Sequence, residues 1–99
     1  MLKLPLPNPP PAPTGLKVDS TTVTTATISW DPVVYDGGIR EYQVYRNGSS
    51  VGTSTTASFK DTGLTGDTTY TYKVKAIANN GLESEFSVDL PAKTTPSAG

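Results

Sequence analysis

Apolar and polar residues alternate along the central part of the chain. Ala26, Ile28 and Trp30 occupy alternate positions, and the positions between them hold Thr27 and Ser29. Residues two apart point to the same side of an extended strand, so this segment has one apolar and one polar side. No window of the sequence shows the 3.6-residue apolar period of an amphipathic helix. The pattern therefore predicts an all-β chain.

The same alternation, interrupted by turn residues, predicts seven strands. Turns are expected at residues 36–38, 47–48, 63–67 and 79–81, which are rich in Gly, Asn and Asp, the residues that tolerate positive φ. Because each strand has one apolar side, the strands are expected to form two antiparallel sheets that close on a shared core. Six of the expected strands are marked by apolar residues, which are Leu16 and Val18; Ala26, Ile28 and Trp30; Tyr42 and Val44; Ala57 and Phe59; Tyr70, Tyr72, Val74, Ala76 and Ala78; and Val88, Leu90 and Ala92. The seventh is a weak strand at residues 50–54.

Proline marks the N-terminal boundary of this folded region. Six of the nine prolines lie between Pro5 and Pro13, where φ is fixed and backbone donors are missing. Such a segment favours a semi-rigid polyproline II spacer. The other end, residues 95–99, is small and polar and also contains a proline. We therefore expect a Pro-rich linker at residues 1–12, one domain at residues 13–94 and a second linker at residues 95–99.

Composition narrows the classes of function. The 99 residues include no Cys and no His, which excludes a thiolate nucleophile, an imidazole base, a disulfide and a zinc site of the usual kind. The formal charge of -1 leaves no excess of positive charge to neutralise a phosphate backbone or anionic lipid. Neither nucleic acid nor a membrane is expected as a partner, and no cofactor or metal is expected. The abundance of serine and threonine predicts a surface rich in hydroxyl groups. Such a composition is associated with exported bacterial modules.

Acidic residues remain as candidates for chemistry. Glu83 and Glu85 are two apart, and Asp61 and Asp67 flank a turn. A carboxyl that acts as a general acid needs a cleft whose burial raises its pKa, and side chains fill the interior of a small sandwich. These carboxylates are therefore expected to be solvated loop charges. The chain is not expected to be an enzyme, and no catalytic residue is assigned.

Two tyrosines are candidates for surface contacts. Tyr35 lies in the loop after Trp30, and Tyr45 points away from the core if Tyr42 and Val44 point into it. Exposed aromatic rings stack on sugar rings, so the two tyrosines are candidate contacts for a carbohydrate or another partner. The alternative is that they cover a sheet face or pair across strands.

An ordered set of motifs resembles the fibronectin type III domain. The motifs are Pro13-x-x-Leu16, Trp30 at the end of the second strand, Tyr42-x-Val44-Tyr45-Arg46, Asp61-Thr62-Gly63-Leu64 and Tyr70-x-Tyr72-x-Val74-x-Ala76. The resemblance covers about residues 13–94 and implies a seven-stranded antiparallel immunoglobulin-like β-sandwich. The resemblance implies that Trp30 packs under the sheets and that the Leu64 side chain fills the core. It also implies that Tyr70 forms a tyrosine corner, in which its hydroxyl makes a hydrogen bond to the preceding loop. Ile28 and Val74 are the other main core residues expected.

The resemblance also implies a function. Residues 42–48 and 80–84 are similar to the bacterial branch of the family, found in secreted cellulases, chitinases and surface proteins. This implies a monomeric, non-catalytic accessory or spacer module of an extracellular bacterial polysaccharide-degrading enzyme. Its partners are expected to be neighbouring domains of the same polypeptide and insoluble polysaccharide. The open alternatives are a carbohydrate- or protein-binding module, and a structural module of a bacterial surface adhesin or phage particle.

Overall fold

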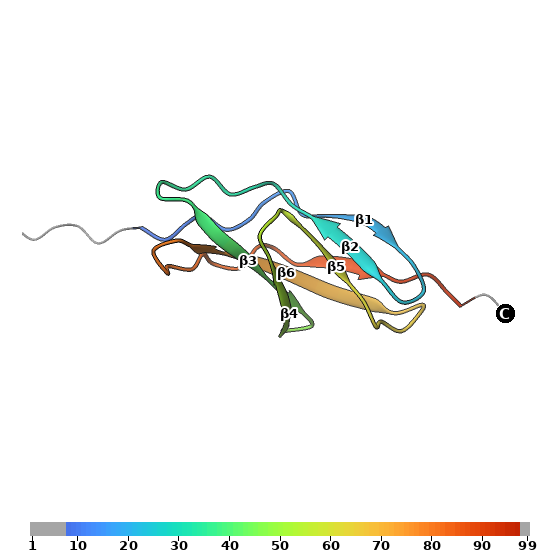
Figure 1. Ribbon diagram of the computed structural model, residues 1–99. Coiled ribbons are helices and arrows are strands. Elements are labelled where there is room, and N and C mark those ends of the chain that lie inside the picture. The colour runs from blue at the N-terminus through green and yellow to red at the C-terminus, as the bar shows by residue number, and fades with distance from the viewer. Residues whose placement is uncertain (1–7, 98–99) are drawn as a thin grey trace, which may run out of the picture.

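The computed structural model describes residues 8–97, so residues 1–7 and 98–99 of the two predicted linkers lie outside the described residues. The described part of the chain forms seven β-strands and no helix (Figure 1). It accordingly holds no helix that would span a membrane. The strands are β1 (Lys17–Thr21), β2 (Ala26–Ser29), β3 (Ile39–Arg46), β4 (Ser49–Ser54), β5 (Ser58–Asp61), β6 (Thr69–Ala78) and β7 (Leu90–Lys93).

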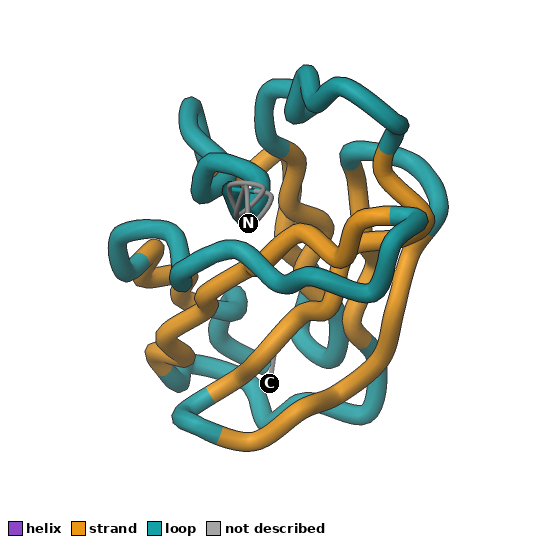
Figure 2. Tube along the Cα trace, turned by 90° about the vertical axis from the view of Figure 1, so that its left-hand side faces the viewer, coloured by secondary structure: helices purple, strands orange, loops and turns teal. Residues whose placement is uncertain are grey.

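The strands form two antiparallel sheets. One sheet has the order β1-β2-β5, and the other has the order β4-β3-β6-β7. The longest pairing joins β3 to β6, from Ile39 opposite Ala78 to Arg46 opposite Tyr72. This arrangement confirms the predicted seven-stranded antiparallel sandwich. The chain enters at one end of the sandwich and leaves at the other (Figure 1), and Figure 2 looks along the molecule from the N-terminal end, where several loops gather.

The core lies between the two sheets. The Trp30 and Tyr42 rings meet edge to face, with 5.3 Å between centroids and 68° between planes. Alternation produces this core, because each strand turns every second side chain inward. The buried apolar residues of the core cluster are Ala26, Ile28, Trp30, Tyr42, Val44, Leu64, Tyr72, Val74, Ala76 and Ala92.

The loop before β6 is fixed to the core by two contacts. Leu64 is buried, and its backbone N–H donates to the Thr24 carbonyl at 2.8 Å. Tyr70 is half-buried, and its hydroxyl accepts a hydrogen bond from the Thr65 backbone N–H at 2.8 Å. This is the bond back to the preceding loop that the resemblance implies for Tyr70.

The last strand starts later than the sequence suggests. Val88 is 79% exposed, so the expectation that it continues the inward side of Leu90 and Ala92 is wrong. The segment before it pairs with β6 at Ser84 and Ser87, three residues apart, opposite Ala76 and Val74, two residues apart. The same offset recurs before β7, because Ser87 lies opposite Val74 and Leu90 lies opposite Tyr72, three residues against two. The extra residue between Ser87 and Leu90 shifts the alternation, so Val88 points outward although Leu90 and Ala92 point inward.

Serine side chains complete this irregular pairing. The Ser84 and Ser87 hydroxyls accept from the backbone N–H groups of Ala76 and Val74, at 2.8 and 3.0 Å. The backbone N–H groups of the same serines donate to the Ala76 and Val74 carbonyls, both at 2.8 Å. Each serine therefore satisfies both polar groups of one β6 residue, so the segment stays attached to β6 where it is no longer a regular strand.

Candidate functional site

An aromatic cluster covers part of the outer face of the four-stranded sheet. It consists of Tyr45, Lys73, Lys75 and Phe86. The rings of Tyr45 and Phe86 meet edge to face, with 4.8 Å between centroids and 85° between planes. The Lys75 ammonium lies 5.5 Å from the centroid of the Tyr45 ring and 5.2 Å from that of Phe86. Tyr45 therefore points away from the core, as expected, but its ring is already in contact with neighbours.

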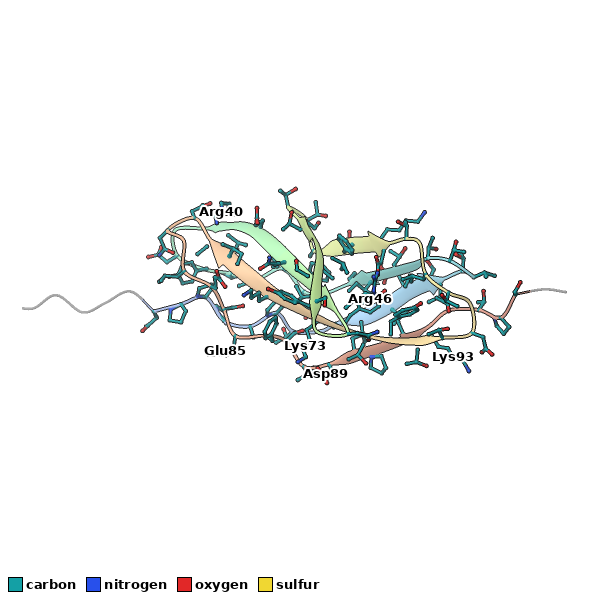
Figure 3. The ribbon with its side chains drawn as sticks, turned by 90° about the horizontal axis from the view of Figure 1, so that it is seen from below. Arg40, Arg46, Lys73, Glu85, Asp89 and Lys93 are labelled. Carbon is teal, nitrogen blue, oxygen red and sulfur yellow. The ribbon has the colours of Figure 1, made fainter. Side chains whose placement is uncertain are left out.

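Both lysines of the aromatic cluster are paired with carboxylates. Lys75 Nζ lies 2.6 Å from Glu83 Oε1, and this hydrogen bond raises the pKa of Lys75. Lys73 Nζ lies 3.7 Å from Asp89 Oδ1, and Figure 3 shows these two residues at the same side of the molecule. The charges of the two lysines are thus balanced by these carboxylates, and the polar groups of the cluster have partners within the same module. Exposed surface pairs of this kind contribute little to stability.

Phe86 is the aromatic residue that the sequence interpretation missed. It is 42% exposed, and the Lys73 ammonium lies 5.4 Å from its ring centroid. The serine-tethered segment places it on the outer face beside Tyr45. Its signal in the sequence is the spacing Ser84-x-x-Ser87, which does not fit the alternation of a regular strand.

Tyr35 lies at the N-terminal end of the sandwich. Its hydroxyl donates to the Asn8 backbone carbonyl and accepts from Asn80 Nδ2 at 3.3 Å. A hollow of about 390 Å³ is lined here by these three residues together with Val34 and Asp36. Tyr35 is therefore engaged with the incoming chain.

The two candidate tyrosines do not form a joint platform. Tyr35 bonds Asn80 beyond the end of β6, whereas Tyr45 pairs with Lys73 within it. Seven residues of extended chain separate Lys73 from Asn80, which corresponds to about 20 Å. The structure therefore places the two tyrosines at different parts of the surface.

Asp61 is buried between the sheets, which corrects the expectation of a solvated loop charge. It is 6% exposed, and its Oδ2 accepts from Arg46 Nη1 at 2.6 Å and from the Tyr72 hydroxyl at 2.7 Å. Its Oδ1 accepts from the Thr62 backbone N–H at 3.1 Å. Figure 3 shows Arg46 toward the middle of the molecule rather than at its rim. Asp61 comes from the three-stranded sheet and its two side-chain partners from the other, so this triad joins the two layers.

The triad affects the ionisation of both partners. Burial, followed by the hydrogen bond to Asp61, raises the pKa of Tyr72 well above its ordinary value. The hydrogen bond to Asp61 also raises the pKa of Arg46. With both side-chain partners donating to it, the carboxylate is fully engaged inside the fold. The triad is therefore a structural element rather than an acid–base centre.

The other acidic residues lie at the surface. Asp31 and Asp36 are exposed in the loop after β2, and Asp67 lies 3.2 Å from Lys93 Nζ. Glu85 is exposed in the serine-tethered segment. Between residues 8 and 97, no three His, Cys, Asp or Glu side chains gather as a metal site would require. The described surface offers two features that could contact a partner, the hollow at the N-terminal end and the aromatic cluster.

Two relatives show where similar modules occur. Exoglucanase B of Cellulomonas fimi is 44% identical over 90 residues, which cover 89% of this chain and 8% of that protein. A poly(3-hydroxybutyrate) depolymerase of Ralstonia pickettii is 45% identical over 83 residues, which cover 84% of this chain and 16% of that protein. The chain therefore spans a small part of each relative.

The fold and the family agree. The sixth fibronectin type III domain of human fibronectin type III domain containing protein 3 has a TM-score of 0.77 at 25% identity, over 96% of this chain and 94% of that one. The model of the fibronectin type III domain matches residues 11–93. The chain therefore belongs to the fibronectin type III family, as the sequence motifs indicate, and contains a single domain of this non-catalytic kind.

Proposed function

We propose that the chain is a non-catalytic spacer module of an extracellular bacterial polymer-degrading enzyme of the cellulase or chitinase type. The observation that carries this proposal is the similarity to two enzymes with different substrates. The chain is 44% identical to part of an exoglucanase and 45% identical to part of a poly(3-hydroxybutyrate) depolymerase. A glucan and a polymer of 3-hydroxybutyrate present different groups to a binding surface. A module shared so evenly between them favours a task that does not depend on the chemistry of the polymer.

The geometry supports separation of neighbouring domains. The chain enters and leaves at opposite ends of the sandwich (Figure 1). Strand β6 alone, with ten residues, spans about 33 Å. A rigid body of this length keeps a catalytic domain and a second domain apart while it limits how far they diverge. The resulting effective concentration at a solid substrate would be the contribution of the module.

The test compares variants of the parent enzyme. Deleting residues 13–94 should lower the rate of hydrolysis of solid polymer and leave that of soluble fragments unchanged. Replacing the same residues with an unrelated β-sandwich of similar length should restore most of the loss, whereas a Gly/Ser linker should restore less. Equal rates for the deletion variant and the parent on solid polymer would contradict the proposal. So would failure of the unrelated sandwich to restore the rate.

A binding role is the second candidate, favoured by one observation. Phe86 and Val88 are exposed on the same segment, and Phe86 belongs to the aromatic cluster. The isolated module would then be retained on solid cellulose or chitin, or would capture a neighbouring domain. Phe86→Ala should release it, with Val34→Ala at the N-terminal end as the matched control. Retention that is lost only in Phe86→Ala would favour binding over spacing.

A further inference from the structure

The first described residues of the chain pack against the sandwich. Pro10 and Pro13 are buried. The Asp31 backbone N–H donates to the Thr14 carbonyl at 2.8 Å, and the Tyr35 hydroxyl donates to the Asn8 carbonyl. Residues 8–13, here called the arm, are therefore held at both ends. The partners of the hydrogen bonds at Asn8 and at Thr14, which directly follows the arm, lie in the loop at residues 31–38 after β2.

The surface that receives the arm is itself fixed. The Gly38 backbone N–H donates to the Tyr35 carbonyl at 2.9 Å, which closes a turn around this tyrosine. Asn79 joins the loop to the turn after β6, through Nδ2 to the Gly37 carbonyl at 2.8 Å and through its backbone N–H to the Gly38 carbonyl at 3.1 Å. The Asn80 amide then reaches the Tyr35 hydroxyl. Tyr35 is thus also held by contacts that do not involve the arm.

The composition of the arm lowers the entropic cost of holding it. Four of its six residues are prolines, with Asn8 and Ala12 as the exceptions. Proline has a fixed φ, so the free arm already samples few conformations and loses little entropy when it docks. A few contacts therefore suffice to fix it, whereas a Gly/Ser segment of the same length would need many more.

We propose that the arm is a rigid part of the module, docked in a cradle formed by residues 31–38 and 79–81 through Tyr35, and that it sets the direction in which a preceding domain projects. This inference rests on the proposed spacer role and adds that the spacer fixes the orientation of the preceding domain as well as its distance. The other end is tied as well, because the Thr95 backbone N–H donates to the Thr22 carbonyl and the Thr95 carbonyl accepts from the Asp67 N–H, both at 3.1 Å. The fixed body therefore extends from residue 8 to residue 95.

The docking of the arm is tested by NMR relaxation on the 99-residue chain. The heteronuclear NOE values of the Asn8 and Ala12 amides should approach those of β2 and β3. Tyr35→Phe should lower the Asn8 value, because it removes the donor to the Asn8 carbonyl. The matched control is Tyr45→Phe, which removes a hydroxyl on the outer face of the sheet and should change neither value. Values typical of a flexible chain at Asn8 and Ala12 in the wild type, or no response to Tyr35→Phe, would overturn the proposal.

The directional role is tested with a small inert reporter domain of known structure fused directly before Asn8. Residual dipolar couplings should give reporter and sandwich alignment tensors of similar magnitude. Replacing residues 8–13 with six Gly and Ser residues should reduce the reporter tensor several-fold. A tensor equally reduced with the native arm would overturn the proposal. Because neither experiment involves a polymer or an enzyme, each can fail while the deletion of residues 13–94 still impairs hydrolysis, and the reverse also holds.

Discussion

Trp30 contributes mainly through its volume. Its ring packs edge to face on Tyr42 in the core. Within the described part of the chain its indole Nε1 is buried without a hydrogen-bond partner, so its stabilising contribution comes from packing rather than from a polar contact. We expect Trp30→Ala to lower the free energy of unfolding by about 3–5 kcal/mol. Urea unfolding measures this, with Val34→Ala, at a residue 90% exposed, expected to change it by less than about 0.5 kcal/mol. A cost of Trp30→Ala below about 1 kcal/mol would contradict the assignment.

Tyr70 contributes a hydroxyl to a loop. Removing that hydroxyl in Tyr70→Phe leaves the Thr65 backbone N–H without its protein acceptor. We expect a loss of roughly 1–2 kcal/mol, nearer the lower value because Thr65 is exposed and water can replace the acceptor. Thermal or urea unfolding of Tyr70→Phe beside Tyr45→Phe measures the difference. Equal stability of the two variants would show that the corner bond contributes nothing specific.

The individual residues differ in how well the sequence predicts them. Trp30 and Leu64 follow from alternation and from an ordered set of motifs. The burial of Asp61 does not follow, because a charged residue beside a turn is normally solvated. Its partners Arg46 and Tyr72 lie 15 and 11 positions away in the other sheet. Only the packing of the two sheets brings these three residues together.

At the scale of elements, the two serines replace part of a strand. Ser87→Ala would leave the buried Val74 backbone N–H without an acceptor, and Ser84→Ala would do the same at Ala76. Each substitution is expected to cost about 1–3 kcal/mol. It should also accelerate hydrogen exchange of the affected β6 amide. Ser58→Ala, at an exposed serine, is the matched control. Unchanged exchange at Val74 and Ala76 would mean that the hydroxyls are not the acceptors.

The same segment shows why some elements are predicted and others are not. The two-residue period between turn residues predicts β1, β2, β3, β5 and β6. Strand β4 is expected only as a weak strand, because Val51 is its one apolar residue. The period breaks between Ser84 and Ser87 and again between Ser87 and Leu90, so alternation alone places Val88 on the wrong side and does not indicate Phe86. A side chain that acts as a backbone acceptor leaves no trace in a hydrophobic pattern. The docking of the arm was equally invisible, since proline-rich composition is typical of linkers.

At the scale of the whole molecule, the sandwich is a body fixed at both ends with few uncommitted groups. Tyr45 is covered by Phe86 and Lys75, and Tyr35 is bonded to the arm. The buried triad of Arg46, Asp61 and Tyr72 joins the two sheets. These features favour a mechanical role over recognition, because both candidate contact residues, Tyr35 and Tyr45, are already engaged inside the module.

The triad makes the stability of the whole molecule sensitive to alkaline pH. The pKa of Tyr72 is raised in the folded state, whereas in the unfolded chain it returns to about 10. Above pH 10 the unfolded chain therefore releases a proton that the folded chain keeps. The contribution of Tyr72 is fully present below pH 10 and is lost as the pH rises toward the folded-state pKa. Wild-type stability should accordingly fall above pH 10, with Tyr72 contributing at most about 1.4 kcal/mol per pH unit to the slope.

Tyr72→Phe separates this effect from the ionisation of other groups. Lys75 also has a raised pKa, so the wild type alone loses stability with pH for more than one reason. The difference in unfolding free energy between wild type and Tyr72→Phe at pH 8 measures the hydroxyl bond to Asp61. The same difference followed from pH 10 to 12 should shrink. In the wild type, Tyr72 ionises in the unfolded chain and so stabilises that state, whereas the variant has no hydroxyl to ionise. Urea unfolding at each pH provides the measurement. Parallel curves for the two proteins across this range would show that Tyr72 ionises as easily in the fold as in the unfolded chain, and that the triad does not protect its proton.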